Sequence, residues 1–240
     1  VDGAAWRSTI VLTNTTANTA SASLIFHSET TGGATQPWSP PFLETSSTTG
    51  ISLPGGSSMF LHTPGTAANV AQGWAELNAD NGIAAYVIFT YRVPGRPDQD
   101  GTAPAVAGSS RILVPFDNAS GTASAIAIVN PTATAQSIFV TYRTSNGTVT
   151  ASSLPSLPPF GHAAFFLPQL FPKMNGQIGL AEFYSASGNF SLIGLHFDPT
   201  KASLTAAPVY SQTGPPVIYA PNVDYPPDYY YGYQADKSVK

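Results

Sequence analysis

A stretch of the chain that occurs twice places the strongest constraint on its fold. Residues 73–92 read GWAELNADNGIAAYVIFTYR, and residues 179–197 read GLAEFYSASGNFSLIGLHF. Placing their first glycines in register aligns Glu76 with Glu182. Each copy has two apolar-rich runs around an Asn/Asp/Ser/Gly turn, a pattern typical of a β-hairpin. The chain is therefore expected to contain two related β domains.

Other segments repeat in the same order. Residues 6–14 and 22–27, expected to pair with each other, return within residues 123–143, and the Leu-Pro corner of residues 51–62 returns in residues 156–167. Each copy is expected to end in a Pro-containing apolar strand, at residues 111–117 and 204–211. Short strands at a spacing of roughly 8–12 residues, with no convincing helix, indicate antiparallel β-sandwiches of immunoglobulin-like architecture. We therefore predict an all-β fold with two tandem sandwich domains, residues 1–117 and 118–211.

Composition excludes several classes of function. Charged residues make up 9% of the chain, far below the roughly 25% of ordinary soluble domains. With nine basic and thirteen acidic residues, no basic patch for nucleic acid is expected. The absence of cysteine excludes disulfides, thiolate metal sites and cysteine nucleophiles. No run approaches the ~18 apolar residues of a membrane helix, so membrane insertion is not expected. A surface this poor in charge is expected either to be coated with Ser, Thr, Asn, Gln and Gly or to be covered by neighbouring copies of the chain.

Four features together resemble a tandem β-sandwich repeat of large secreted bacterial surface proteins. They are a first strand ending in Asn14 or Asn130, the LP–G corner, the G-x-A-E strand and a closing strand with Pro. The resemblance covers residues 6–211 and implies a structural or adhesive role without an active site. The chain begins at Val1 without a Met, as a processed secreted protein does. We expect a secreted protein, extracellular or at the cell surface.

Residues 212–240 form a Tyr/Pro-rich tail with six of the eleven tyrosines and five of the twenty-two prolines. The prolines exclude a helix and favour an extended arm. Tyrosine is enriched at interfaces, so we predict that the arm docks on a neighbouring subunit. The alternatives are an arm folded back on its own domains and a disordered tail. The predicted subunit-interface residues are Val217, Ile218, Tyr219, Tyr225, Tyr229, Tyr230, Tyr231 and Tyr233.

Two loops of the first copy contain candidate ligand contacts. Asp98 and Asp100 precede a glycine and form a weak calcium candidate that lacks the remaining acidic ligands of an EF-hand; the alternative is an exposed polar loop. Trp38 is a candidate for stacking on a sugar ring, with packing in a core or an interface as the alternative.

Four asparagines lie in N-x-S/T sequences, the acceptor motif of N-glycosylation, and are candidate glycosylation sites; the alternative is a chance match, which arises easily in a chain this rich in Ser and Thr. They are Asn14, Asn118, Asn146 and Asn189. The four histidines are dispersed, and no nucleophile, general-base or phosphate-binding motif is present.

We therefore expect a protein that is not an enzyme and needs no cofactor. The predicted function is an extracellular structural subunit that self-assembles into a filament or surface layer, with the arm as the tie between copies. The alternative is a carbohydrate-binding or adhesive module with a polysaccharide partner.

Overall fold

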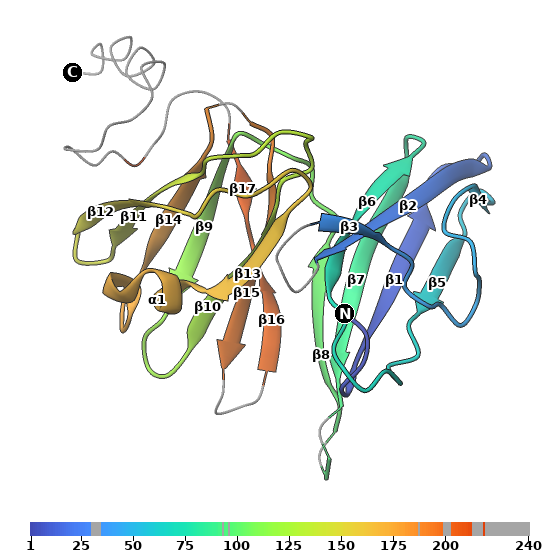
Figure 1. Ribbon diagram of the computed structural model, residues 1–240, viewed down its shortest axis with the longest axis horizontal. Coiled ribbons are helices and arrows are strands. Elements are labelled where there is room, and N and C mark those ends of the chain that lie inside the picture. Colours follow the sequence, from blue (N-terminus) through green and yellow to red (C-terminus); the bar gives the residue numbers. More distant parts are fainter. Residues whose placement is uncertain are drawn as a thin grey trace. The chain divides into compact units, whose positions relative to one another are not determined.

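The computed structural model describes residues 1–29, 35–92, 94–95, 97–186, 188–198, 203–212 and 218. Its strand pairs with a stated register are all antiparallel, and the fold is all-β, as the sequence predicts (Figure 1). Contacts divide the chain into two compact units, residues 1–106 with 202–206, and residues 107–201 with 207–240. Among the described residues, no helix has the length and apolar character needed to cross a bilayer.

The first unit consists of two antiparallel sheets. One has the order β5 (Ser58–His62), β1 (Trp6–Asn14), β7 (Ile83–Tyr91) and β8 (Gln99–Pro104). The other is centred on β2 (Ala20–Glu29), which pairs with β3 (Thr35–Trp38), β4 (Ile51–Leu53) and β6 (Gly73–Ala79). Ala22 pairs with both Ile51 and Ala79, so β4 and β6 lie on opposite edges of β2.

The second unit repeats this plan. One sheet has the order β13 (His162–Phe166), β10 (Ala123–Val129), β15 (Ser191–Asp198) and β16 (Ser203–Ala207). The contact division counts most of β16 with the first unit, although β16 is hydrogen-bonded to β15. The other has the order β12 (Val149–Ser153), β11 (Phe139–Thr144), β14 (Ile178–Tyr184), β9 (Arg111–Asp117) and β17 (Tyr210–Ser211). Strands β1, β2, β5, β6 and β7 therefore correspond to β10, β11, β13, β14 and β15.

The duplicated segment is not a hairpin, so that prediction is wrong. Strand β6 pairs with β2 in one sheet, whereas β7 pairs with β1 and β8 in the other, and β14 and β15 part in the same way. The predicted pairing of residues 6–14 with 22–27 is wrong for the same reason, because β1 and β2 lie in different sheets. Period-two alternation shows which face of a strand is buried, but not which strand supplies its hydrogen bonds. Leu77 of β6 and Ile83 of β7 pack on the same core from opposite sheets.

Asn14 and Asn130 stabilise the same corner in the two units. Asn14 is fully buried, and its Nδ2 donates to the backbone carbonyls of Asn18 and Leu53 at 2.7 and 3.0 Å. Its Oδ1 accepts from Thr16 N at 2.9 Å. Asn130 Nδ2 donates to the carbonyls of residues 134 and 158, and its Oδ1 accepts from residue 132 in the same pattern. In each unit the asparagine side chain thus supplies hydrogen-bond partners to backbone carbonyl and N–H groups at the corner.

Strand β9 belongs to the second unit, so the boundary differs from the one predicted at residue 117. Ile112, Val114 and Phe116 alternate inward and are buried in the second core. The contact division accordingly falls between residues 106 and 107. Sequence comparison placed this strand at the end of the first copy because it resembles residues 204–211, but its apolar face completes the core that follows it.

The second unit also contains two helical turns that the sequence analysis missed, α1 (Leu167–Leu170) and η1 (Pro172–Met174). Each has a proline at one of its first two positions, where proline is compatible with a helix. Leu167, Phe171 and Met174 are buried in the core. Burial of these three side chains explains why a short apolar run folds back as helix instead of extending as a strand.

Candidate functional site: the free edge of strand β6

Strand β6 has a neighbour on one edge only, among the residues that the structure describes. It pairs with β2 along its whole length. Asp80 N donates to Ser21 O, and backbone groups alternate in direction along an antiparallel strand. The N–H and C=O groups of Ala75, Leu77 and Ala79 therefore point away from β2. An unpaired edge of this kind is a template for pairing with another strand.

The corresponding edge of the second unit is covered. Strand β9 pairs with β14 over its full length, from Asp117 opposite Ile178 to Arg111 opposite Tyr184. Strand β17 then adds to the far edge of β9. In the first unit, Asp2 pairs with Ala71 at the position where Asn118 pairs with Gln177 in the second, so the counterpart of β9 falls on the positions directly before Val1.

This difference changes the burial of side chains on the inner face. Ala181 and Phe183 of β14 are fully buried, because Val114 and Ile112 of β9 lie opposite them. Their counterparts on β6 are Ala75, which is exposed, and Leu77, which is half-buried. Among the described residues, no strand therefore covers the core of the first unit along this edge.

The outer face of the same sheets differs as well. Glu182 is buried and its Oε1 forms an ion pair with Arg111 Nε at 2.6 Å. Its Oε2 accepts a hydrogen bond from the backbone N–H of Ile218 at 2.8 Å. Glu76, the counterpart of Glu182, is half-buried, and its carboxylate has no hydrogen-bond or ion-pair partner in the described part of the chain. Ile25, opposite Glu76, is 44% exposed.

Two contacts fix the start of β6. A Cβ at Gly73 would collide with the carbonyl oxygen of His27, just as a Cβ at Gly179 would collide with that of Arg143. The two glycines that open the duplicated segment are therefore required by close backbone approach. Trp74 stacks on His27, with ring centroids 4.5 Å apart and an interplanar angle of 16°, which places an indole ring on β6 itself.

The other sheet of the first unit presents a row of aromatic side chains on its outer face. Phe60 of β5 and Tyr86 of β7 both lie opposite Val11 of β1, one on either side. They are 47% and 40% exposed, whereas Val11 is buried. At a strand spacing of about 4.8 Å, the backbones of Phe60 and Tyr86 lie about 10 Å apart across β1.

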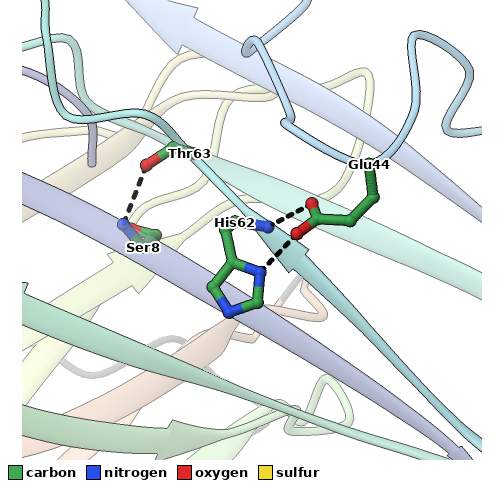
Figure 2. A network of polar contacts seen from close by, with 4 residues as sticks. All are labelled: Ser8, Glu44, His62 and Thr63. Carbon is green, nitrogen blue, oxygen red and sulfur yellow. Dashed lines mark hydrogen bonds and ion pairs between the residues drawn. The ribbon is translucent and has the colours of Figure 1, made fainter.

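A polar network lies next to this aromatic row (Figure 2). His62 stacks on Phe60 with ring centroids 6.4 Å apart. The Glu44 carboxylate accepts from the His62 backbone N–H at 2.8 Å and contacts His62 Nδ1 at 2.5 Å. Desolvation raises the pKa of Glu44, but the hydrogen bonds from His62 outweigh it, so this pKa lies below its usual value. On the neighbouring strand, Ser8 N donates to Thr63 Oγ1 at 2.9 Å.

The two aspartates of the calcium candidate have protein partners. Asp98 forms an exposed ion pair with Arg7 at 3.1 Å, and Asp100 on β8 accepts a hydrogen bond from Thr90 Oγ1 at 2.6 Å. In the described part of the chain, no group of three or more acidic or histidine side chains is arranged to hold a metal ion. The structure therefore adds no further ligand to this pair.

Trp38 lies on β3 and is half-buried. It packs edge-on against Phe26, with ring centroids 6.1 Å apart and an interplanar angle of 86°, and contacts the first core. This is the packing role that the sequence analysis gave as the alternative to sugar stacking.

The N-x-S/T asparagines fall into two groups. Asn14 and Asn118 are buried, and their Nδ2 groups donate to backbone carbonyls, so the fold is incompatible with a glycan on either and these two predictions are wrong. Asn146 and Asn189 are exposed. Of the predicted arm contacts, Val217, Tyr219, Tyr225, Tyr229, Tyr230, Tyr231 and Tyr233 lie outside the described residues.

Ile218 is 3% exposed and lies against its own chain. Its backbone N–H supplies the second hydrogen bond that the buried Glu182 carboxylate needs. For Ile218 the structure therefore shows an intramolecular position instead of the predicted contact with a neighbour.

Sequence reasoning aligned Glu76 with Glu182 but did not find the open edge or the role of Arg111. The available signal was that an acidic residue recurs at the same strand position in both copies. Comparison of the chain with protein-family models, with curated proteins and with solved structures gives no match.

Proposed function

We propose that the chain is a non-enzymatic structural protein that acts outside the cell by associating with copies of itself. The observation that carries this proposal is the edge of β6, where, among the described residues, the outward backbone groups of Ala75, Leu77 and Ala79 have no strand partner. A second copy that adds a strand there would satisfy the outward backbone groups of Ala75, Leu77 and Ala79 and shield the opened core. Strand addition is a recurrent mode of protein association.

Two features of the sequence support this proposal. The low share of charged residues, 9%, leaves few of the charges that protect an exposed edge from pairing. The six tyrosines of residues 212–240 provide contact area of the kind found at interfaces. An arm that ties neighbouring copies together would extend the association into a filament or a surface layer, because contacts that do not close generate open polymers.

Sedimentation velocity over a range of concentrations tests this function. The intact protein is expected to form species larger than the 25.0 kDa chain. Ala75→Pro removes one outward N–H without touching the ladder to β2, and it is expected to weaken self-association at least about tenfold, because one lost hydrogen bond with a steric block exceeds about 1.4 kcal/mol. The matched control is Ala75→Ser, which keeps the N–H. A monodisperse monomer at all concentrations would contradict the proposal.

The aromatic row of Phe60 and Tyr86 favours a second candidate function, binding to polysaccharide. Two partly exposed aromatic side chains on strands that flank β1 suit stacking on the sugar units of an extended chain, and they replace Trp38 as the best-placed aromatics for this role. A pull-down on insoluble polysaccharides with the Phe60→Ala and Tyr86→Ala variants tests it. Retention that both substitutions leave unchanged would reject this surface as the binding site.

A further inference from the structure

We infer that the aromatic row of the first unit, Phe60 and Tyr86, binds the Tyr/Pro-rich segment, residues 219–233, of a second copy of the chain. This inference rests on the proposed function, because it names one contact through which copies associate. The surface concerned is the outer face of the sheet β5–β1–β7–β8, to which β6 does not belong (Figure 1).

The aromatic row is part of an apolar line that crosses its whole sheet. Phe60 and Tyr86 flank Val11, and Pro104 of β8 lies opposite Tyr86. Residues directly opposite one another on neighbouring strands share a face of the sheet, and Phe60, Tyr86 and Pro104 are exposed. Exposed apolar surface of this kind is typical of interaction sites.

The second unit has the same sheet without the aromatic row. Ala127 is the counterpart of Val11, and its partners on β13 and β15 are Ala164 and Ile193. The plan of the unit can therefore be built without an aromatic ring at either position. The two rings of the first unit are thus a feature of its surface that the fold itself does not require.

The segment 219–233 has the composition that an aromatic surface binds. Its sequence, YAPNVDYPPDYYYGY, contains six tyrosines and three prolines. Pro-rich segments favour the extended polyproline II conformation and dock on surfaces lined with aromatic side chains. The tyrosines add rings that can pack against those of the row. The chain therefore contains both the surface and a ligand of matching chemistry.

The spacing of the segment also fits the row. Residues three apart lie on the same side of a polyproline II helix, about 9.3 Å from one another. Pro227, Tyr230 and Tyr233 have this spacing in the sequence. The backbones of Phe60 and Tyr86 are about 10 Å apart across β1. Two successive members of the set can therefore contact the two aromatic side chains at once.

The residue directly before this segment is held on the second unit of its own chain. Ile218 is 3% exposed, and its N–H donates to the Oε2 atom of the buried Glu182 at 2.8 Å. Fifteen residues, from 219 to 233, would span about 45 Å when extended at about 3.1 Å per residue. A segment that is fixed at Ile218 and binds the aromatic row of another copy ties the two copies together. Repetition of this head-to-tail contact gives an open polymer.

The test uses the peptide YAPNVDYPPDYYYGY with a fluorescent label, whose anisotropy is measured as intact protein is added below the concentration at which the protein self-associates. Saturable binding is expected. The double variant Phe60→Ala/Tyr86→Ile has the residues of the second unit at these positions, and it is expected to bind the peptide at least about tenfold more weakly, because both rings are lost. The control Ile25→Ala removes a side chain of similar exposure, 44%, from the other sheet and is expected to leave binding unchanged.

A second peptide tests the contribution of the prolines. Alanine in place of Pro221, Pro226 and Pro227 keeps all six tyrosines but removes the preference for the extended conformation. This peptide is expected to bind several-fold more weakly, because it must be ordered when it binds.

Tryptophan fluorescence reports which unit binds the peptide. All three tryptophans of the chain, Trp6, Trp38 and Trp74, lie in the first unit, and the peptide has none. Binding at the aromatic row is therefore expected to change the tryptophan emission. Circular dichroism checks that each variant is folded.

Three results would overturn the inference: no saturable binding, binding that Phe60→Ala/Tyr86→Ile does not weaken, or equal binding of the peptide without prolines. Retention on polysaccharide without peptide binding would also overturn it, by assigning the row to the second candidate function. Self-association of the intact protein without peptide binding rejects this inference alone. Peptide binding to a protein that stays monomeric at all concentrations rejects the proposed function and, with it, the contact between copies.

Discussion

At the scale of single residues, the side chains that matter most are polar groups buried inside an apolar fold. Asn14 and Asn130 hold equivalent corners with equivalent sets of hydrogen bonds. Arg111 and Glu182 form an ion pair that is almost completely removed from water. Groups of this kind are costly to leave unpaired, so their contribution is measured by removing one partner at a time.

Asn14→Ala is expected to lower the free energy of unfolding of the first unit by about 1–3 kcal/mol, because backbone carbonyls at the corner lose a buried donor. Asn14→Asp is expected to cost at least as much, since a carboxylate cannot donate to the carbonyls of Asn18 and Leu53. Urea unfolding followed by tryptophan fluorescence measures both. Asn78→Ala, at an exposed position of β6, is the control and is expected to cost under about 0.5 kcal/mol.

Arg111→Met is expected to destabilise the second unit by about 3–5 kcal/mol, because it leaves the Glu182 carboxylate buried without its cation. The double variant Arg111→Met/Glu182→Leu is expected to recover most of this loss, although the N–H of Ile218 then lacks its acceptor. Urea unfolding followed by circular dichroism measures the cycle. Equal losses in the single and double variants would show that the ion pair is not the cause.

At the scale of elements, the chain contains the same strand in two settings. Strand β14 is central in its sheet, between β11 and β9, whereas β6 is paired with β2 alone among the described strands. The duplicated sequence GxAE thus forms a strand in both units, but the neighbouring strands differ. A substitution that removes the backbone N–H pointing away from β2 or β11 is therefore expected to have different effects in β6 and β14.

Ala181→Pro is expected to destabilise the protein by about 3 kcal/mol or more, because the lost N–H points towards β9 and proline is excluded from central strands. The equivalent substitution on the edge strand, Ala75→Pro, is expected to cost at least about 2 kcal/mol less. Thermal unfolding of the two variants side by side checks this difference. Equal destabilisation would mean that the edge of β6 is paired in solution.

At the scale of the whole molecule, two units of common plan have cores of different completeness. The second core contains buried residues from both sheets, including β9, and from the helical turns, whereas the first core, among the described residues, draws on its own two sheets with no strand beyond β6. Since apolar burial is the largest stabilising term, the first unit is expected to be the weaker of the two.

Heating is therefore expected to unfold the first unit before the second. Tryptophan fluorescence reports on the first unit alone, and circular dichroism at peptide-bond wavelengths reports on both, so the fluorescence midpoint is expected at the lower temperature. Coincident midpoints for the two signals would contradict independent units of unequal stability.

The sequence by itself determined the all-β class, the duplication and the faces of the strands, because alternation and repetition are local properties that any register preserves. It also marked Glu76 and Glu182 as equivalent and Asn14 and Asn130 as strand ends. Pairing partners were decided only by the tertiary structure: β6 and β7 join different sheets, and β9 completes the second unit. A hydrogen bond to a distant strand does not change the apolar alternation of either strand. The sequence alone therefore could not predict that β6 pairs only with β2 among the described strands, or that Arg111 and Glu182 form an ion pair.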